Sequence, residues 1–153
     1  AWPVRAGRVP LVAALAVLLI AFAATIQVRT TEWGDPVAIY EAMTARAPAS
    51  FFVQSNLGLQ YLKRGRANDA VDALRRARDL EPDNPVAWNN LGVALAGSGR
   101  LEEARQAYER AIALRGEYPK AYENLAAVLL ALGDRAGAEA AARAARELTR
   151  RMR

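Results

Sequence analysis

Apolar residues recur every three or four positions through residues 85–114, and the pattern is interrupted once, near Gly99. The apolar positions are Trp88, Leu91, Leu95, Leu101, Ala104, Tyr108, Ala111 and Leu114. This spacing predicts two amphipathic helices, each with one buried face. Gly99 lies between them, where a helix end favours a residue that tolerates a positive φ.

The same pattern occurs three times along the chain at a fixed offset of 34 residues, because 51–84, 85–118 and 119–152 align without a gap. The matched sets include Asn56, Asn90 and Asn124; Gly65, Gly99 and Gly133; Ala77, Ala111 and Ala145; and Leu80, Leu114 and Leu148. A single helix pair cannot bury its apolar face alone, and about three stacked pairs are needed. The chain is therefore predicted to be all-α, an α-solenoid of three hairpins over 51–84, 85–118 and 119–153.

The period and the packing residues resemble the tetratricopeptide (TPR) repeat family. The middle segment carries the resemblance at Trp88, Leu91, Gly92, Ala104, Tyr108 and Ala111. The small residues Gly58, Gly92 and Ala126 are expected to let paired helices approach closely. The resemblance implies a concave face lined by the first helix of each hairpin, which is suited to binding proteins.

Residues 31–50 are predicted to form a linker and a half-repeat capping helix in front of the first hairpin. Asp35 is a favourable N-cap and Pro36 suits the first turn of a helix that runs to Ala47. Val37, Tyr40 and Met43 form its apolar stripe, and Pro48 stands where a repeat-ending proline belongs.

The last helix, roughly Arg135 to Arg151, is predicted to bury mainly alanines, namely Ala138, Ala141, Ala142 and Ala145. A solenoid generally needs a polar capping repeat at its end. Either these small residues taper the core, or this alanine face docks on a partner.

Residues 1–30 are predicted to be a membrane anchor, because residues 10–28 form an apolar run with only Thr25 and Gln27 polar. Such a run is about long enough to span a ~30 Å hydrocarbon core as a transmembrane helix. The residues expected at the two membrane interfaces are Trp2, Arg5, Arg8, Arg29 and Trp33. A cleaved signal peptide is the alternative, with Ala21-Phe22-Ala23 as its cleavage site, but the run is long for that role.

The charges beside this segment predict its orientation. Arg5 and Arg8 precede it with no acidic residue, whereas Glu32 and Asp35 follow it closely. The positive-inside rule then places the N-terminus in the cytoplasm and the repeats outside it. In a bacterium this is a single pass through the inner membrane with the repeats in the periplasm.

The composition argues against an enzyme and against nucleic-acid binding. The chain has no His and no Cys, which removes imidazole bases, thiol nucleophiles and the usual zinc ligands, and no cofactor or metal is expected. Three of the 21 basic residues, Arg5, Arg8 and Arg29, flank the apolar run, so the remainder carries 18 basic against 16 acidic side chains. Basic clusters such as Lys63-Arg64-Arg66 lack interleaved aromatic residues, and neither nucleic acid nor a small-molecule substrate is predicted as a partner.

The predicted site is instead a protein- or peptide-binding groove on the first helices of the hairpins. Its candidate residues are Phe52, Ser55, Asn56, Leu59, Asn89, Asn90, Val93, Lys120, Glu123 and Asn124. Asn56, Asn90 and Asn124 repeat with the period and are expected to form a ladder whose amides can pair with a peptide backbone. This ladder is similar to the one in the repeats of the O-linked N-acetylglucosamine transferase family. Asparagine is also simply common at this position of such repeats, which is the alternative explanation.

The order of features carries a second resemblance. The chain is similar to the C-terminal region of bacterial polytopic membrane proteins related to O-mannosyltransferases. The similarity lies in a membrane helix that is followed by a linker and then by the repeats. The linker residues are Trp33, Asp35, Pro36 and Tyr40. Two functions are therefore expected. In the first, a membrane-anchored interaction module acts as an accessory or scaffold subunit, or as an assembly factor, of a membrane protein complex. In the second, the chain is the TPR portion of a polytopic glycosyltransferase-like protein and recruits acceptor proteins, with the catalytic residues lying elsewhere.

Overall fold

The computed structural model describes residues 34–153. The predicted membrane span, 10–28, and its flanking residues Trp2, Arg5, Arg8, Arg29 and Trp33 lie outside the described part. The chain divides into two compact units, 1–39 and 40–153, and the three hairpins belong to the second. Within residues 34–153, no helix combines the length and the apolar character that crossing a bilayer requires.

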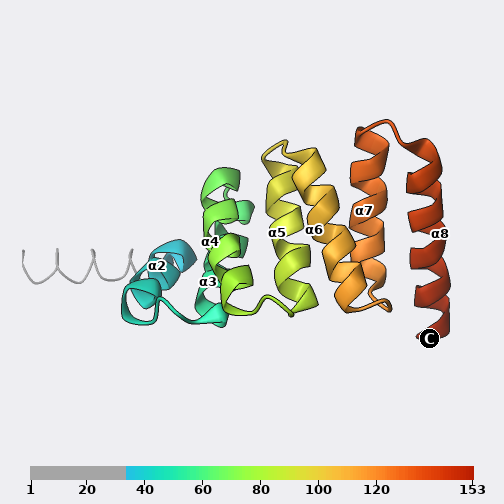
Figure 1. Cartoon of the computed structure of the whole chain (residues 1–153). Helices are drawn as coiled ribbons and strands as arrows, with labels where there is room; N and C mark the ends of the chain where they lie inside the picture. Colours follow the sequence, from blue (N-terminus) through green and yellow to red (C-terminus); the bar gives the residue numbers. More distant parts are fainter. Residues whose placement is uncertain (1–33) are drawn as a thin grey trace, which may run out of the picture. The chain divides into compact units, whose positions relative to one another are not determined.

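Seven helices make up the described part of the chain (Figure 1). They are α2 (Pro36–Arg46), α3 (Phe51–Lys63), α4 (Ala67–Leu80), α5 (Pro85–Gly97), α6 (Leu101–Leu114), α7 (Pro119–Ala131) and α8 (Arg135–Arg151). Helices α3, α5 and α7 begin at the first residue of the three predicted repeats. The prediction of three helix hairpins, with all-α structure, is confirmed over this range.

The ends of the helices follow from local sequence. The side chains of Ser50 and Asn84 accept hydrogen bonds from the backbone N–H groups of Val53 and Val86, at 3.4 and 2.9 Å, and so cap α3 and α5. Each hairpin turns at a glycine in the left-handed region, with φ of 71° at Gly65, 78° at Gly99 and 89° at Gly133. Glycine adopts this conformation without the steric cost of a Cβ, as the sequence predicted for Gly99.

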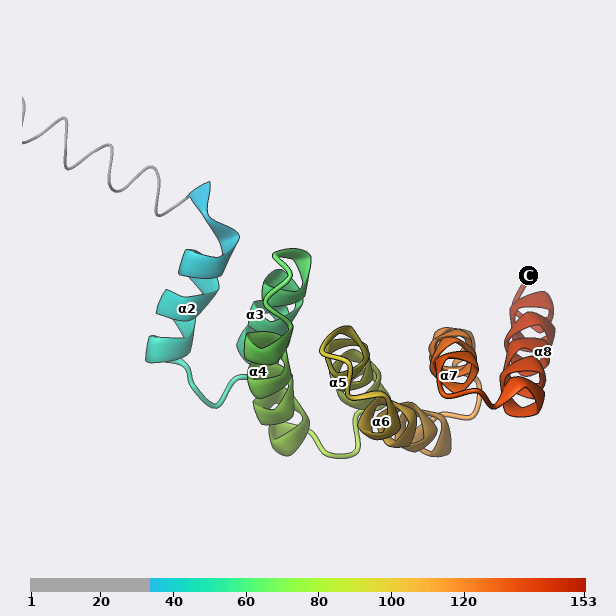
Figure 2. The same cartoon turned by 90° about the horizontal axis from the view of Figure 1, so that it is seen from above.

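Within residues 40–153 the hairpins stack so that their first helices form one layer. Helix α5 packs against both α3 and α7. Within the described residues the backbones of the second helices α4, α6 and α8 do not pack against one another, and an ion pair of 3.3 Å between Arg75 and Glu103 joins α4 to α6. Figure 2 shows the hairpins following a curve, with α5 on its inner side and α6 on its outer side. The first helices therefore line the concave face of the repeat unit.

Each of the first two hairpins is closed by a pair of facing residues, one on each helix. In the first hairpin Gly58 faces Leu74, and a Cβ on Gly58 would lie 2.5 Å from Leu74 Cγ. In the second, a Cβ on Gly92 would lie 2.6 Å from Tyr108 Cε1. The close approach predicted at these glycines is confirmed, because a large side chain on the second helix occupies the space that their missing Cβ leaves.

The segment before the first hairpin is tied to it by polar contacts. Tyr61 Oη donates to Glu41 Oε1 at 2.7 Å, and Arg66 lies 3.8 Å from the same carboxylate. Gln54 Nε2 donates to the carbonyl of Pro48 at 3.1 Å, and Trp88 Nε1 donates to that of Pro82 at 2.6 Å. The donors Gln54 and Trp88 are 34 residues apart, and so are Pro48 and Pro82. Pro48 therefore occupies the position of a repeat-ending proline.

The Tyr61–Glu41 contact makes a testable prediction about alkaline stability. Burial, the hydrogen bond to Glu41 and the charge of that carboxylate together raise the pKa of Tyr61 to about 12 from its ordinary 10.0. An unfolded tyrosine ionises near pH 10, so the folded state loses relative stability as the pH rises from 10 through 12, by about 1 kcal/mol at pH 11.

Tyr61→Phe should lower the free energy of unfolding by about 1 kcal/mol at pH 8, because the hydrogen bond is lost. This deficit should shrink toward zero by pH 11 in urea titrations that compare the two proteins. Burial also raises the pKa of Tyr108, but that residue is present in both proteins and its effect cancels. A deficit that stays constant between pH 8 and pH 11 would contradict the prediction.

Candidate functional site

The predicted groove residues lie on one face of the first helices. Phe52, Ser55, Asn56 and Leu59 are spaced three and four residues apart on α3, and the matching positions of α5 and α7 are 34 and 68 residues later. Leu59 and Val93 are half-buried, and Ala127 at the same position of α7 is exposed. The α3, α5 and α7 residues therefore form a surface that continues along the concave face.

A row of exposed side chains runs across the start of these helices. Phe52 is 61% exposed, and Val86 at the matching position of α5 is 38% exposed. Lys120 follows on α7, where its Nζ lies 3.2 Å from Glu123 Oε2. Val86 is absent from the sequence-based candidates although the 34-residue period places it in line with Phe52. These three residues, the Phe52–Val86–Lys120 row, offer apolar contact at one end and a cation at the other.

The asparagines of the predicted ladder are hydrogen-bonded within the protein. Asn90 Nδ2 donates to Ser55 Oγ at 3.4 Å, and Asn124 Nδ2 donates to Asn89 Oδ1 at 3.0 Å. A longer contact of 3.5 Å joins Asn89 Nδ2 to Asn90 Oδ1. A polar chain thus links α3 to α5 and α5 to α7, which the sequence pattern did not predict.

Some of the predicted groove residues are buried in this polar chain and are not exposed to a ligand. Ser55 and Asn89 are only 6% and 5% exposed, so they contribute to helix packing. Asn56, Asn90 and Asn124 are half-buried, and Asn56 Nδ2 donates to the carbonyl of Phe52 in its own helix at 2.8 Å. Peptide binding through these three asparagines stays a prediction, and a peptide would have to compete with these internal bonds.

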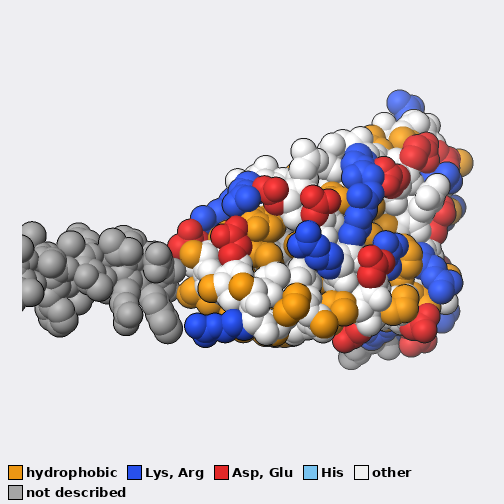
Figure 3. All heavy atoms as spheres, turned by 60° about the vertical axis from the view of Figure 1, so that its left-hand side comes forward, with side chains coloured by type: hydrophobic (Ala, Val, Ile, Leu, Met, Phe, Trp, Pro, Cys, Tyr) orange, Lys and Arg blue, Asp and Glu red, His pale blue; other side chains and the backbone are white. Residues whose placement is uncertain are grey.

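Charges of both signs are interspersed on the protein surface. Arg66 is paired with Asp69 at 2.6 Å, and Arg100 is paired with Glu103 at 2.6 Å. Figure 3 shows Lys and Arg side chains mixed with Asp and Glu over one face of the molecule, with apolar side chains between them. Over residues 34–153 no group of acidic side chains is placed to hold a metal ion.

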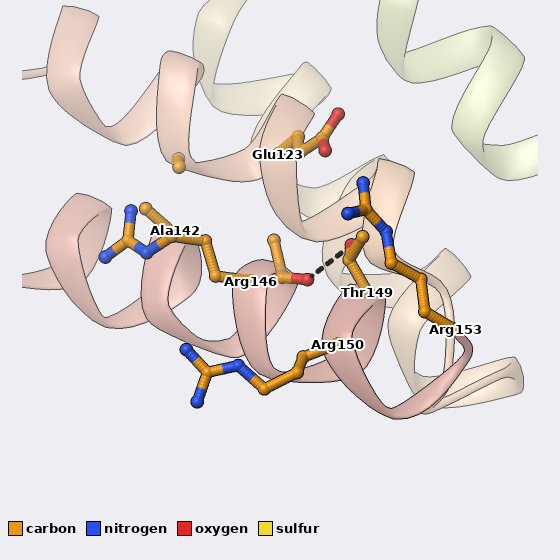
Figure 4. A pocket seen from close by; sticks show the side chains of 8 residues that line it. Glu123, Ala142, Arg146, Thr149, Arg150 and Arg153 are labelled. Carbon is orange, nitrogen blue, oxygen red and sulfur yellow. Dashed lines mark hydrogen bonds between the residues drawn. The ribbon is translucent and has the colours of Figure 1, made fainter.

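A hollow with a volume of about 530 Å³ lies between α7 and α8, at the C-terminal end of the repeat unit. It is lined by Glu123, Ala126, Ala142, Ala145, Arg146, Thr149, Arg150 and Arg153. Figure 4 shows Arg153 extending back from the end of α8 toward Glu123 of α7. Thr149 Oγ1 donates to the carbonyl of Ala145 at 2.8 Å, so this hydroxyl is satisfied within its own helix. The hollow combines an alanine floor with basic side chains around it.

Comparison with known proteins identifies the repeat. The tetratricopeptide repeat profile matches residues 55–119 and again 97–151. The chain belongs to the tetratricopeptide repeat family. The matched ranges together cover most of the described residues, and the resemblance noted in the sequence is confirmed at the level of the family.

Several solved structures are similar to this TPR chain. MamA MSR-1 is 28% identical with a TM-score of 0.70, and the match covers 82% of this chain and 72% of that one. The first TPR of Spaghetti (RPAP3), bound to the HSP90 peptide SRMEEVD, is 28% identical with a TM-score of 0.62 over 64% of this chain and 78% of that one. MamA from Desulfovibrio magneticus RS-1 is 22% identical with a TM-score of 0.72, covering 80% of this chain and 70% of that one, and it shows the fold alone. No curated protein matches the sequence.

These findings assign the chain to a class of function. The family match and the similar structures indicate a protein–protein interaction module, and they point to no enzymatic homologue. The relation to O-mannosyltransferases and the membrane location receive no support from these comparisons and remain predictions.

Proposed function

We propose that this TPR chain is a membrane-anchored protein-interaction module that acts as an accessory or scaffold subunit, or as an assembly factor, of a membrane protein complex. The observation that carries the interaction role is the Phe52–Val86–Lys120 row on the concave face, where two apolar side chains are left exposed beside a cation. Exposed aromatic side chains are enriched where proteins bind one another.

The proposed membrane location rests on the sequence before the repeats. The apolar run 10–28 is the anchor, and the charges beside it favour an N-terminus in the cytoplasm and repeats in the periplasm of a bacterium. The second candidate is the TPR portion of a polytopic glycosyltransferase-like protein that recruits acceptor proteins. It is favoured by the linker residues Trp33, Asp35, Pro36 and Tyr40 between the apolar run and the repeats.

The experiment is purification of the full chain from native membranes in mild detergent, with mass spectrometry of the proteins that accompany it. Wild type is compared with Lys120→Glu and with a control, Arg76→Glu, which makes the same charge change at an exposed position of α4. Loss of the Lys120–Glu123 pair should cost well below about 1 kcal/mol of stability, because both groups are exposed.

We expect a partner at fixed stoichiometry that is retained by Arg76→Glu and reduced several-fold by Lys120→Glu. Equal recovery from both variants would show that the groove is not the interface. Recovery of the chain alone from membranes would contradict the subunit role. Recovery within a longer polypeptide would favour the second candidate. Absence of the chain from membranes would contradict the anchor.

A further inference from the structure

Helix α2 corresponds in sequence to the second helix of a repeat. The offset of 34 residues matches α2 with the end of α4, and it matches residues 17–29 with the whole of α3. Val37 of α2 is 3% exposed, and Val71, its match on α4, is 1% exposed. Helix α2 is therefore buried on one side as a second helix is, and the first helix of its repeat would be residues 17–29, which lie outside the described part of the chain.

The apolar face of α2 is more exposed than the matching face of α4. Ile39 and Met43 match Ala73 and Ala77, which are 2% and 0% exposed in the packed repeats. Ile39 and Met43 are 37% and 38% exposed, although they are much larger side chains. Covering such side chains is favourable because it removes apolar surface from water.

Residues 17–29 carry the small residue that a hairpin with α2 would need. Tyr40 lies between Ile39 and Met43 and matches Leu74, the residue that faces Gly58 across the first hairpin. Ala24 stands at the position of Gly58, and the third hairpin also has an alanine at this position. The 34-residue period thus extends into the apolar run at the position where paired helices approach most closely.

The connection to α2 and the neighbouring side of α3 are compatible with this hairpin. Residues 30–35 would join 17–29 to α2, whereas three residues suffice between α3 and α4. In the second and third repeats an asparagine donates to the preceding first helix, but Asn56 Nδ2 donates to the carbonyl of Phe52 in its own helix at 2.8 Å. Ala21 stands at the acceptor position of residues 17–29, so a helix there would cost Asn56 no hydrogen bond.

We propose that residues 17–29, when they are outside a bilayer, pack on α2 as the first helix of a fourth, N-terminal hairpin. Most of these residues belong to the apolar run 10–28, so this hairpin and the inserted anchor exclude one another. The hairpin covers Ile39 and Met43, and it shields one side of the apolar run from water before the chain reaches a membrane. This segment is the occupant because the period sets its register and six residues tether it to α2, which gives it a high effective concentration there.

The test is disulfide cross-linking of Ala24→Cys/Tyr40→Cys in the full chain, made by cell-free synthesis with and without lipid nanodiscs. The chain has no Cys, so disulfides form only between the introduced residues. A Cβ on Gly58 would lie 2.5 Å from Leu74 Cγ, so Cβ atoms at this pair of positions are within about 4 Å of each other, as a disulfide requires. The control pair is Ala24→Cys/Ala42→Cys, because Ala42 is exposed and lies two residues from Tyr40, on the opposite side of α2.

Without nanodiscs we expect an intramolecular disulfide in most of the Ala24→Cys/Tyr40→Cys chain, several-fold more than in the control pair. Nanodiscs should bind the chain and lower the cross-linked fraction several-fold. Adding Met43→Glu to the first pair should also lower it several-fold without nanodiscs, because a carboxylate on the apolar face of α2 would be buried by the hairpin. Adding Ala45→Glu, at an exposed position of α2, is the matched control and should leave the fraction unchanged.

Equal cross-linking of the two cysteine pairs, equal effects of the two glutamates, or complete aggregation without nanodiscs would overturn the proposal. Disulfides between chains would overturn it in favour of a second copy on α2, and cross-linking undiminished in nanodisc-bound chain would overturn the exclusion. This inference shares residues with the anchor of the proposed function, but the two can fail separately. A chain that binds nanodiscs and does not cross-link without them would keep the anchor and refute the hairpin. A chain that cross-links and does not bind nanodiscs would keep the hairpin and refute the anchor.

Discussion

Leu74→Ala is expected to lower the free energy of unfolding of the protein by about 3 kcal/mol or more. Leu74 is fully buried on α4 and faces Gly58 on α3 across the first hairpin. Because Gly58 has no side chain, it cannot fill the space that the leucine leaves. The cavity should therefore persist, and its cost adds to the lost transfer free energy of the leucine.

The measurement is urea denaturation followed by far-UV circular dichroism. Leu130→Ala is the matched control, because it makes the same chemical change on a side chain of α7 that is 61% exposed. The control should cost less than about 1 kcal/mol. Equal losses from the two variants would mean that the Gly58–Leu74 pair does not hold the first hairpin together.

The third hairpin has a small residue in its facing pair, and the position of this pair at the end of the solenoid explains why the small residue is tolerated. Ala142 stands where Leu74 and Tyr108 stand in the earlier hairpins, and the resulting hollow lies at the end face. An open hollow can be filled by water or by a partner, whereas a closed cavity in the first hairpin cannot be filled so easily. The interior of the repeat unit thus depends on these pairs, and its end leaves one of them incomplete.

The period of the sequence was sufficient to predict the hairpins and the glycine turns. Helices α3, α5 and α7 start at Phe51, Pro85 and Pro119, the first residues of the repeats. The periodic signal is strong because each repeat must present the same packing positions to its neighbours. The three turn glycines have positive φ for the same reason, since each hairpin turns through an equivalent conformation.

The candidate site was only partly predictable, because exposure depends on what covers a residue. Ser55, Asn89 and Glu123 share one position of the repeat, yet the first two are buried and the third is exposed. The period treats them alike, whereas burial depends on whether a helix follows. The internal bond from Asn124 to Asn89 depends on the distance between stacked helices, which periodicity does not specify. Val86 could have been found by applying the period to Phe52.

Gly92→Ala is the second substitution expected to have a large effect, with a loss of about 2 kcal/mol of stability. A Cβ at Gly92 would lie 2.6, 2.8 and 2.9 Å from Cε1, Cδ1 and Cζ of Tyr108. The ring is buried, and its helix α6 packs against α7, so it cannot move aside without disturbing its surroundings. The steric cost should exceed the gain of up to about 1 kcal/mol that alanine brings to a helix interior.

Gly97→Ala is the matched control in the same helix, because its added Cβ would meet only Leu62 and Ala67 at 3.8 and 3.9 Å. These are ordinary contact distances, so this variant should be neutral or more stable by up to about 1 kcal/mol. Thermal and urea unfolding should therefore show a loss of stability for Gly92→Ala and no loss for Gly97→Ala, although the chemical change in α5 is identical. The double variant Gly92→Ala/Tyr108→Ala reproduces the Ala126–Ala142 pair of the third hairpin. It should lose less stability than the sum of its single changes, by about 1 kcal/mol or more. Strict additivity would show that the Gly92–Tyr108 contact is not the source of the loss.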